Sequence, residues 1–385
     1  MSLQIEFEEG LYYRQTLFDK AKRVVVKVGS AVLADKDGLN RHVLDNLARE
    51  ISFLHNSGRE VILVTSGAVA AGKRKLQYSD SKALSMPEKQ ALAAIGQSCL
   101  MHDYDEAFAR NKKNIAQILL THSDLANRKR YLNIRNTIQT LFKLGVIPVI
   151  NENDTVSTEE LKFSDNDNLG ALVTNLIEAD MFICLTDVDG LYDKNPTTDP
   201  TAKIIYTVEK VTEEIINMAG NSKSVLGTGG MQSKIVAAQM VAIGGASSFI
   251  GPGRQDDILK HLFSGELFGT FFLPHKEKMR GRKRWIAYVL KPQGTLKLDS
   301  GACKAIAKGG RSLLPSGVIS VKGEFDVGDS VQCVSESGES IAVGLTNFNA
   351  DDLEKIRGQR TDFIESILGY KEYDEVLHRN NLVLL

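Results

Sequence analysis

The sequence predicts an α/β protein in which helices sandwich an open, mainly parallel sheet, followed by a small β-rich barrel domain. In the first two thirds of the chain, short β-branched runs alternate with segments of helical periodicity. Polar or glycine-bearing breaks come directly after the strands, and beyond residue 295 the chain turns to short strands and many turns. Strands that alternate with helices indicate βαβ units and a parallel sheet that is buried on both faces.

The strands of the large sheet are predicted from dense apolar, β-branched runs that are too short for helices. These runs lie at 23–28, 60–65, 114–121, 146–150 and 181–185. The helices are predicted from apolar residues spaced three and four apart. They lie at 41–55, 88–110, 128–144, 167–178 and 231–243. Residues 1–20 show no clear periodicity and are interpreted as an N-terminal extension.

Length and composition indicate an ordinary globular protein of two domains. The chain has 385 residues, of which 43% are hydrophobic and 25% charged. Its net charge of −1 gives no field that favours nucleic acid or an anionic membrane. No apolar run approaches the ~20 residues that span a bilayer. The start is acidic, without the apolar segment of a secretory signal, and the four cysteines form no CxxC pair, so we expect a cytoplasmic protein without a structural metal site.

Two polar clusters flank the segment that we interpret as the functional site. The first, 151–154, follows the strand 146–150, and the second, 164–168, opens the helix 167–178. Ligands of open α/β sheets bind beyond the carboxyl ends of the strands, where such clusters would lie. The alternative is that Asp165 or Asn166 only caps the helix, which would account for one or two of these residues. Two clusters so close together favour a functional site.

Further polar residues end the neighbouring strands and would meet at the same edge. Gly29 and Ser30 follow the first strand, Ser66 the second, and Thr186 and Asp187 the strand 181–185. Within the first strand itself stands a lysine, Lys27, and a buried lysine needs an anionic partner. For Ser66 the simpler alternative is a helix N-cap. The sheet edge therefore combines a lysine with hydroxyls, amides and carboxylates.

A glycine-rich segment, 227–230, leads into the helix 231–243. Glycines before a helix N-terminus let backbone N–H groups approach phosphate oxygens. The segment fails the Walker pattern, and a flexible loop is the alternative, but Lys234 in the first helical turn favours a phosphate site.

The C-terminal part begins after a basic run, 280–284, beside the only tryptophan, which we interpret as a linker or domain contact. We place the linker at 276–294, the small domain at 295–370 and a tail at 371–385. Between 295 and 370 the chain has eight Lys and Arg against eleven Asp and Glu. This acidic balance argues against RNA binding, which depends on cations.

Six motifs, in order, resemble the amino acid kinase family, in the pattern of its members that act on L-glutamate. They lie at 25–30, 64–72, 150–154, 165–169, 185–192 and 227–231. The resemblance makes 21–275 an amino acid kinase domain, and the distal part resembles a PUA domain. It implies transfer of a phosphoryl group from ATP, with Mg²⁺, to the γ-carboxylate of L-glutamate, which is the first step of proline biosynthesis.

The resemblance also assigns roles to individual residues. Glutamate contacts carry over onto Ser66, Asp154 and Asn166, and Asp165 would orient the catalytic lysines or hold the metal environment. The ATP contacts carry over onto Lys27, Thr186, Asp187, Thr228, Gly229, Gly230, Met231, Gln232, Ser233 and Lys234. The charge of the transferring phosphoryl group would be neutralised by Lys27 and Lys234.

Other properties are left open by the sequence. Another acceptor, such as acetylglutamate, aspartate, carbamate or a nucleotide monophosphate, remains an alternative, because a fold does not fix a substrate. Feedback inhibition by proline and assembly into a homo-oligomer are implied by the resemblance alone.

Overall fold

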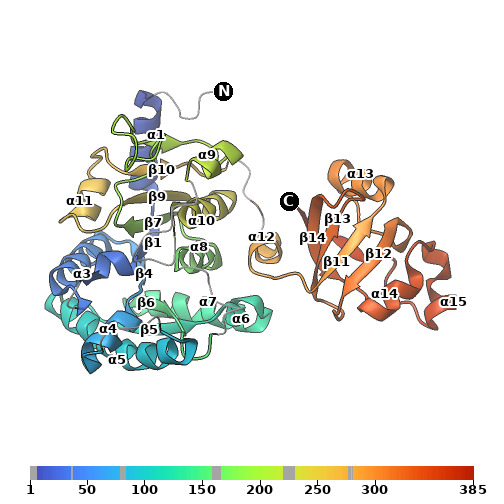
Figure 1. Ribbon diagram of the computed structural model, residues 1–385, viewed down its shortest axis with the longest axis horizontal. Helices are drawn as coiled ribbons and strands as arrows, with labels where there is room; N and C mark the ends of the chain where they lie inside the picture. The colour runs from blue at the N-terminus through green and yellow to red at the C-terminus, as the bar shows by residue number, and fades with distance from the viewer. Residues whose placement is uncertain are drawn as a thin grey trace. The chain divides into compact units, whose positions relative to one another are not determined.

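The computed structural model describes residues 7–35, 38–78, 84–157, 166–219, 230–275, 279 and 281–385. The chain divides into two compact units, Met1–Lys278 and Met279–Leu385, each with its own apolar core (Figure 1). None of the described helices has the length and apolar character that crossing a membrane requires.

The first unit is built on an eight-stranded sheet in the order β5-β6-β4-β1-β7-β9-β10-β8. In chain order its strands are β1 (Arg23–Val28), β4 (Glu60–Val64), β5 (Ile115–Leu120), β6 (Ile147–Glu152), β7 (Met181–Thr186), β8 (Thr207–Val208), β9 (Ser247–Pro252) and β10 (Thr270–Phe272). Neighbouring strands are parallel from β5 to β9, whereas β10 pairs antiparallel with β9 and parallel with β8. A short two-stranded ribbon, β2 (Ala34–Asp35) and β3 (Gly38–Leu39), lies outside this sheet.

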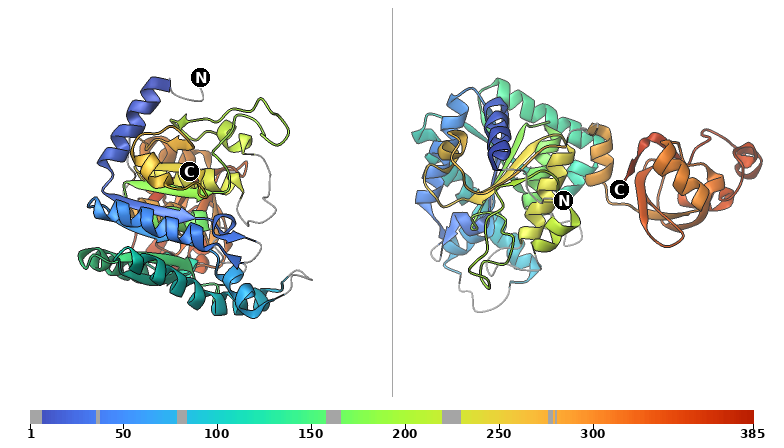
Figure 2. Two further views of the ribbon diagram at one scale, coloured as in Figure 1. Left: turned by 90° about the vertical axis from the view of Figure 1, so that its left-hand side faces the viewer. Right: turned by 90° about the horizontal axis from the view of Figure 1, so that it is seen from above.

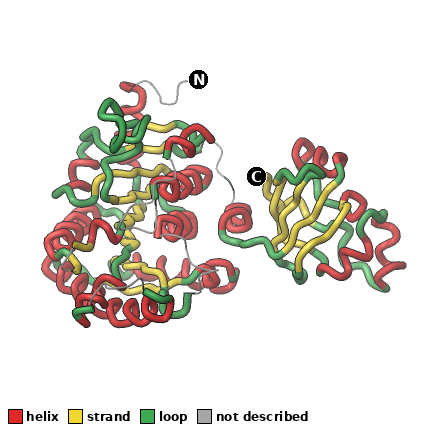
Figure 3. Tube along the Cα trace, viewed as in Figure 1, coloured by secondary structure: helices red, strands yellow, loops and turns green. Residues whose placement is uncertain are grey.

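Helices cover both faces of the large sheet, which confirms the predicted sandwich (Figures 2 and 3). Those of the first unit are α1 (Phe7–Lys20), α2 (Ser30–Leu33), α3 (Arg41–Asn56), α4 (Ala68–Leu76), α5 (Met86–Arg110), α6 (His122–Ala126), α7 (Arg128–Lys143), α8 (Asn166–Leu176), α9 (Glu213–Met218), α10 (Met231–Ile243) and α11 (Ile258–Phe263). In Figure 1, α3 and α11 lie on one side of the sheet and α8 and α10 on the other.

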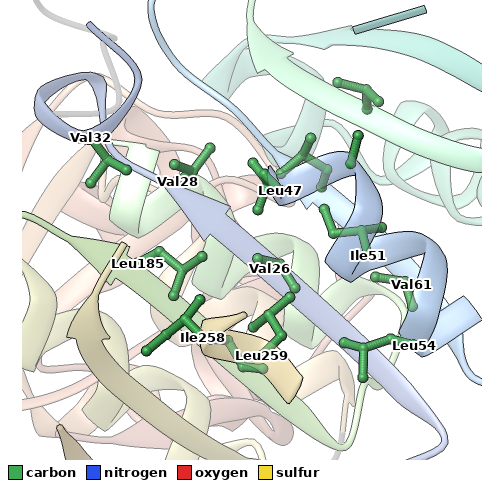
Figure 4. Packing of buried hydrophobic residues seen from close by; sticks show 14 of the residues in the cluster. Val26, Val28, Val32, Leu47, Ile51, Leu54, Val61, Leu185, Ile258 and Leu259 are labelled. Atoms are coloured by element: carbon green, nitrogen blue, oxygen red, sulfur yellow. The ribbon is translucent and has the colours of Figure 1, made fainter. Parts of the chain in front are cut away.

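Alternation along β1 decides which side chain meets which helix layer. Val26 and Val28 belong to the core with α3 and α11, where Ile51 and Leu259 pack against them (Figure 4). Successive side chains of a strand point to opposite faces, so Lys27 points to the α8 face. A Cβ added at Gly170 in α8 would lie 3.4 Å from the Lys27 Cβ, which places the two elements in close contact. The sequence thus places one lysine within a run of valines, where it points towards α8.

Residues 7–20, expected within an N-terminal extension without clear periodicity, form α1 and pack on the rest of the first unit. Phe18 is 1% exposed and contacts the rings of Phe263 and Phe271, each with a centroid separation of 5.2 Å. Arg14 is buried and donates to the carbonyl oxygens of Tyr206 (3.1 Å) and Phe268 (2.8 Å). The helix escaped detection because its buried side is marked by a few residues only, one of which is an arginine.

The second unit contains a five-stranded sheet in the order β12-β11-β13-β14-β15. Its strands are β11 (Gly294–Leu298), β12 (Val318–Gly323), β13 (Ser330–Val334), β14 (Ser340–Thr346) and β15 (Leu377–Leu384). Its α-helices are α12 (Gly281–Tyr288), α13 (Ser300–Gly309), α14 (Ala350–Ile356) and α15 (Ile364–Leu368). The expected β-rich character is confirmed.

Two segments that we expected outside this small domain take part in its structure. The proposed tail 371–385 contains β15, which pairs antiparallel with β14 and adds Leu377 and Leu382 to the core. The proposed linker 276–294 contains α12, which packs on β14 and β15, with Arg284 and Trp285 buried. Both segments carry many polar residues, so their few buried side chains gave too weak a periodicity for detection.

Candidate active site

The strand order brings the polar strand ends together at one edge of the sheet. Adjacent strands lie about 4.8 Å apart, so β6, β4, β1 and β7 present their carboxyl ends within a short distance. These ends carry Asn151 on β6, Ser66 just after β4, Lys27 on β1 and Thr186 on β7. The edge predicted from sequence is therefore present among the described residues.

Asp167, in the first turn of α8, lies between two lysines. Its Oδ1 is 2.5 Å from the Lys27 Nζ, and its Oδ2 is 3.1 Å from the Lys234 Nζ. Asp167 is 0% exposed, Lys27 2% and Lys234 7%. Burial of three charges is tolerable only because they are paired and hydrogen-bonded. One carboxylate therefore holds both lysines that the sequence had singled out.

Sequence reasoning missed Asp167 and assigned the orienting role to Asp165, which lies outside the described residues. The available signal was the helical register. Asp167, the second residue of α8, lies on the side of the helix that faces the sheet and reaches Lys27. Position within a run of alternating Asp and Asn could not by itself show which carboxylate points inward.

A chain of amides joins the predicted acceptor residues. The Asn166 Nδ2 donates to the Ser66 Oγ (2.7 Å), the Thr65 carbonyl oxygen (2.7 Å) and the Asn151 Oδ1 (3.2 Å). Asn151 in turn donates through Nδ2 to the Gln97 Oε1 on α5, at 2.8 Å. The backbone N–H of Glu152 donates to the Asn151 Oδ1, which fixes the orientation of that amide. Ser66 and Asn166 are thus brought together, and Gln97 and Asn151 are members that the predicted set did not contain.

The loop after β4 is shaped by a glycine. Gly67 adopts φ +101°, which L residues rarely occupy, and it precedes the first residue of α4. This turn aims Ser66 back at Asn166 instead of along the helix. Asp154, the remaining predicted acceptor residue, lies in the turn directly after β6, where it is half-buried.

The predicted nucleotide residues occupy the β7 and α10 side of the edge. Thr186 ends β7 and donates through its hydroxyl to the Asp187 Oδ1, at 3.0 Å. Gly230 precedes α10, and the Ser233 hydroxyl in the first turn reaches the Asp167 Oδ2 at 3.1 Å. Met231 and Gln232 lie in the same turn, whereas Thr228 and Gly229 are outside the described residues.

Burial also sets the protonation of a thiol beside Asp167. Cys184 on β7 is fully buried, and its Sγ donates to the Asp167 Oδ1 at 3.3 Å. Desolvation and the neighbouring Asp167 carboxylate raise the pKa of the Cys184 thiol far above its ordinary value, so it stays protonated.

No described group of three or more His, Cys, Asp or Glu is arranged to hold a metal ion.

Comparisons with known proteins identify the family of this chain. The model of the amino acid kinase family matches residues 22–251, and that of the PUA domain matches residues 294–368. The glutamate 5-kinase of Desulfotalea psychrophila is 60% identical over 372 residues, which cover 97% of this chain and 99% of that protein. The glutamate 5-kinase of Citrifermentans bemidjiense is 49% identical over 373 residues, covering 97% and 100%.

A third relative, the glutamate 5-kinase of Caldanaerobacter subterraneus subsp. tengcongensis, is 50% identical over 364 residues, covering 94% of this chain and 98% of that protein. The family matches account for both units of the structure, and the relatives match nearly the whole chain. The chain therefore belongs to the amino acid kinase family, in its glutamate 5-kinase branch, and carries a PUA domain after its kinase domain.

Proposed function

We propose that this protein phosphorylates the γ-carboxylate of L-glutamate with ATP, forming L-glutamyl 5-phosphate, the first intermediate of proline biosynthesis. The observation that supports the site assignment best is the buried pairing of Asp167 with Lys27 and Lys234 beside a chain of amides. Relatives that span the chain carry the name of this activity.

The reaction requires charge neutralisation more than proton transfer. The γ-carboxylate is an anion at neutral pH and attacks the γ-phosphorus directly, with ADP as leaving group, so no general base is needed. The obstacle is the approach of two anions and the charge on the transferring phosphoryl oxygens. Lys27 and Lys234 supply two ammonium groups from opposite edges of Asp167, and this fixed arrangement needs little reorganisation during transfer.

The acceptor is assigned to the β6 and β4 side of the edge. Ser66 and Asn166 present a hydroxyl and an amide in mutual contact, which suits a carboxylate. Asp154, in the turn after β6, would take the α-ammonium group of the amino acid. This division leaves the β1 and β7 side to the nucleotide, with Thr186, Asp187 and the start of α10 as its contacts.

The described residues fit Mg²⁺ as a partner of the nucleotide. Mg²⁺ keeps several waters and takes phosphate oxygens with at most one or two carboxylates, so it needs no protein cage. Asp187, directly after β7, is the carboxylate that would approach it from this chain. Bound there, the ion would supply additional neutralisation of the phosphate charge.

The proposal includes a cytoplasmic location, because the phosphoryl donor is ATP. It also includes assembly into a homo-oligomer and inhibition by proline, which membership of the branch supports. RNA is left out, since the region 295–370 is acidic.

Trapping of the acyl phosphate as a hydroxamate tests the proposal. The protein is incubated with ATP, Mg²⁺, hydroxylamine and L-glutamate, with acetylglutamate and aspartate in parallel. Signal from glutamate alone supports the reaction and the acceptor together. Signal from another acceptor only would retain the nucleotide side and reassign Ser66, Asp154 and Asn166, and folded protein without any signal would refute the kinase assignment.

A further inference from the structure

Cys184 lies beside Lys27 on the face of the sheet that carries the chemistry. The two residues are register partners on the parallel strands β7 and β1. Partners in adjacent parallel strands point to the same face, so the thiol and the lysine both face α8. Their neighbours Ile183 and Val26 instead join the apolar core with α3 and α11. Cys184 therefore lies at a buried strand position where an apolar residue would be expected, yet its thiol contacts the carboxylate of Asp167.

Donors from the described part of the chain reach both oxygens of Asp167. Oδ1 receives Lys27 at 2.5 Å and the Cys184 thiol at 3.3 Å. Oδ2 receives Lys234 and the Ser233 hydroxyl, each at 3.1 Å. Each carboxylate oxygen thus meets one ammonium group and one neutral donor, which approaches the four hydrogen bonds that a carboxylate accepts.

The two neutral donors are not equivalent. The Ser233 hydroxyl has one proton and also lies 2.8 Å from the Gly230 carbonyl oxygen, which competes with Asp167 for it. Among the described residues, the thiol donates to Asp167. Cys184 is therefore the neutral group committed to the carboxylate, on the same oxygen that holds Lys27.

We propose that Cys184 is a positioning residue for phosphoryl transfer, whose thiol holds the Oδ1 edge of Asp167 and so fixes the direction in which Lys27 presents its ammonium group. The inference rests on the phosphoryl transfer proposed above. Rotation of the carboxylate would move both ammonium groups, and transfer depends on their placement. A thiol is a weak donor, but in a buried site it resists that rotation without adding charge.

Two substitutions distinguish a hydrogen-bonding role of the thiol from a packing role, because the two roles predict opposite orders of kcat for the two variants. Cys184→Ser keeps a donor but is less suited to an apolar strand, whereas Cys184→Val fills the strand position and removes the donor. We expect Cys184→Ser to keep kcat within about twofold and Cys184→Val to lower kcat by about five- to tenfold, the effect of one lost hydrogen bond. The KM values for ATP and for glutamate stay within about twofold in both, since the thiol holds Asp167 and touches neither substrate.

The measurement is hydroxamate formation with L-glutamate, together with thermal unfolding of each variant. Cys333→Val, a buried thiol removed from the second unit, is the matched control and keeps wild-type kcat. Wild-type kcat in Cys184→Val, or equal losses in the Ser and Val variants, would overturn the inference. If the Val variant does not fold, Cys184→Ala decides by the same criteria. Wild-type protein without signal would instead refute the proposed function, so the two failures are distinguishable.

Discussion

At the scale of residues, one buried carboxylate holds a pair of lysines. Lys27 comes from the middle of the sheet and Lys234 from the first turn of α10, and Asp167 joins them. Each lysine carries an alkyl stem that packs within the unit while its ammonium group reaches the edge. The arrangement explains why a strand otherwise made of valine and arginine contains one buried lysine.

Lys234→Ala is expected to lower kcat for glutamyl phosphate by about 10²- to 10³-fold, because it removes one preorganised positive charge from the transferring group. The fold is expected to persist, since Lys27 still pairs with Asp167. Steady-state kinetics by hydroxamate trapping measures the change. Lys260→Ala, on the six-residue helix α11, is the matched control with wild-type kcat. An unchanged kcat in Lys234→Ala would exclude Lys234 from the chemistry.

Glu50 provides a residue-scale test of burial, away from the active site. It lies on α3, is 2% exposed and accepts from the backbone N–H of Leu259 at the start of α11. Desolvation raises the pKa of its carboxyl from 4.5 to about 7, although the backbone hydrogen bond opposes this. The folded protein therefore keeps a proton that the unfolded chain releases between these two pH values. The resulting stability is fully present below pH 4.5 and is lost as the pH rises through about 7.

Glu50→Gln removes this titration and keeps an acceptor for the Leu259 N–H. We expect the free energy of unfolding of wild type, relative to this variant, to fall by about 2–3 kcal/mol between pH 4.5 and pH 8. Urea unfolding of both proteins across that range measures the difference. Parallel pH dependences would show that the Glu50 carboxyl titrates normally in the folded protein.

At the scale of elements, the observed helices and strands show how much of the fold could be predicted from the sequence. Strands and helices of the first unit agree with their predicted ranges where the apolar periodicity is strong, as in α3, predicted at 41–55 and observed as Arg41–Asn56. Asn151 and Glu152 were assigned to the polar cluster, but they continue β6. Their polar side chains can be buried there because they form hydrogen bonds with Gln97 and Ser157. An apolar periodicity reveals buried apolar residues, but it does not reveal polar residues that are buried with a hydrogen-bonding partner.

The same limit explains what the sequence did not reveal about the site. The two lysines were predictable, because a charge within a run of valines and a lysine in the first turn of a helix that follows glycines are local signals. Asp167, Cys184 and Gln97 act through partners more than 15 residues away, and such contacts follow from the packing of β7, α5 and α8. The six motifs indicated the class of reaction, whereas the hydrogen bonds of the site could be identified only once the fold was known.

At the scale of elements, α1 is expected to contribute to stability. Phe18→Ala should destabilise the protein by about 3–4 kcal/mol, because it leaves a cavity between Phe263 and Phe271. Tyr12→Ala, on the same helix at 70% exposure, is the control and should change stability by less than about 0.5 kcal/mol. Urea unfolding measures both. Equal, small effects would mean that α1 does not pack on the core in solution.

At the scale of the whole molecule, the two units have separate sheets and separate cores. Every residue that we assign to the chemistry lies in the first. A chain that ends at Lys278 is therefore expected to fold and to form glutamyl hydroxamate. Circular dichroism and the trapping assay test this, with the full-length chain as reference. A truncated chain that stays unfolded would show that the first unit depends on the second.

The most direct test of the central claim is the kcat of Asp167→Asn in the glutamyl hydroxamate assay. Asparagine keeps the shape of the side chain but removes the charge that holds Lys27 and Lys234. We expect kcat per folded molecule to fall by at least about 10²-fold, with a lower thermal transition, because two buried ammonium groups lose their partner. A folded Asp167→Asn protein with wild-type kcat would contradict the account, since the lysine pair would then not need Asp167 for the transfer.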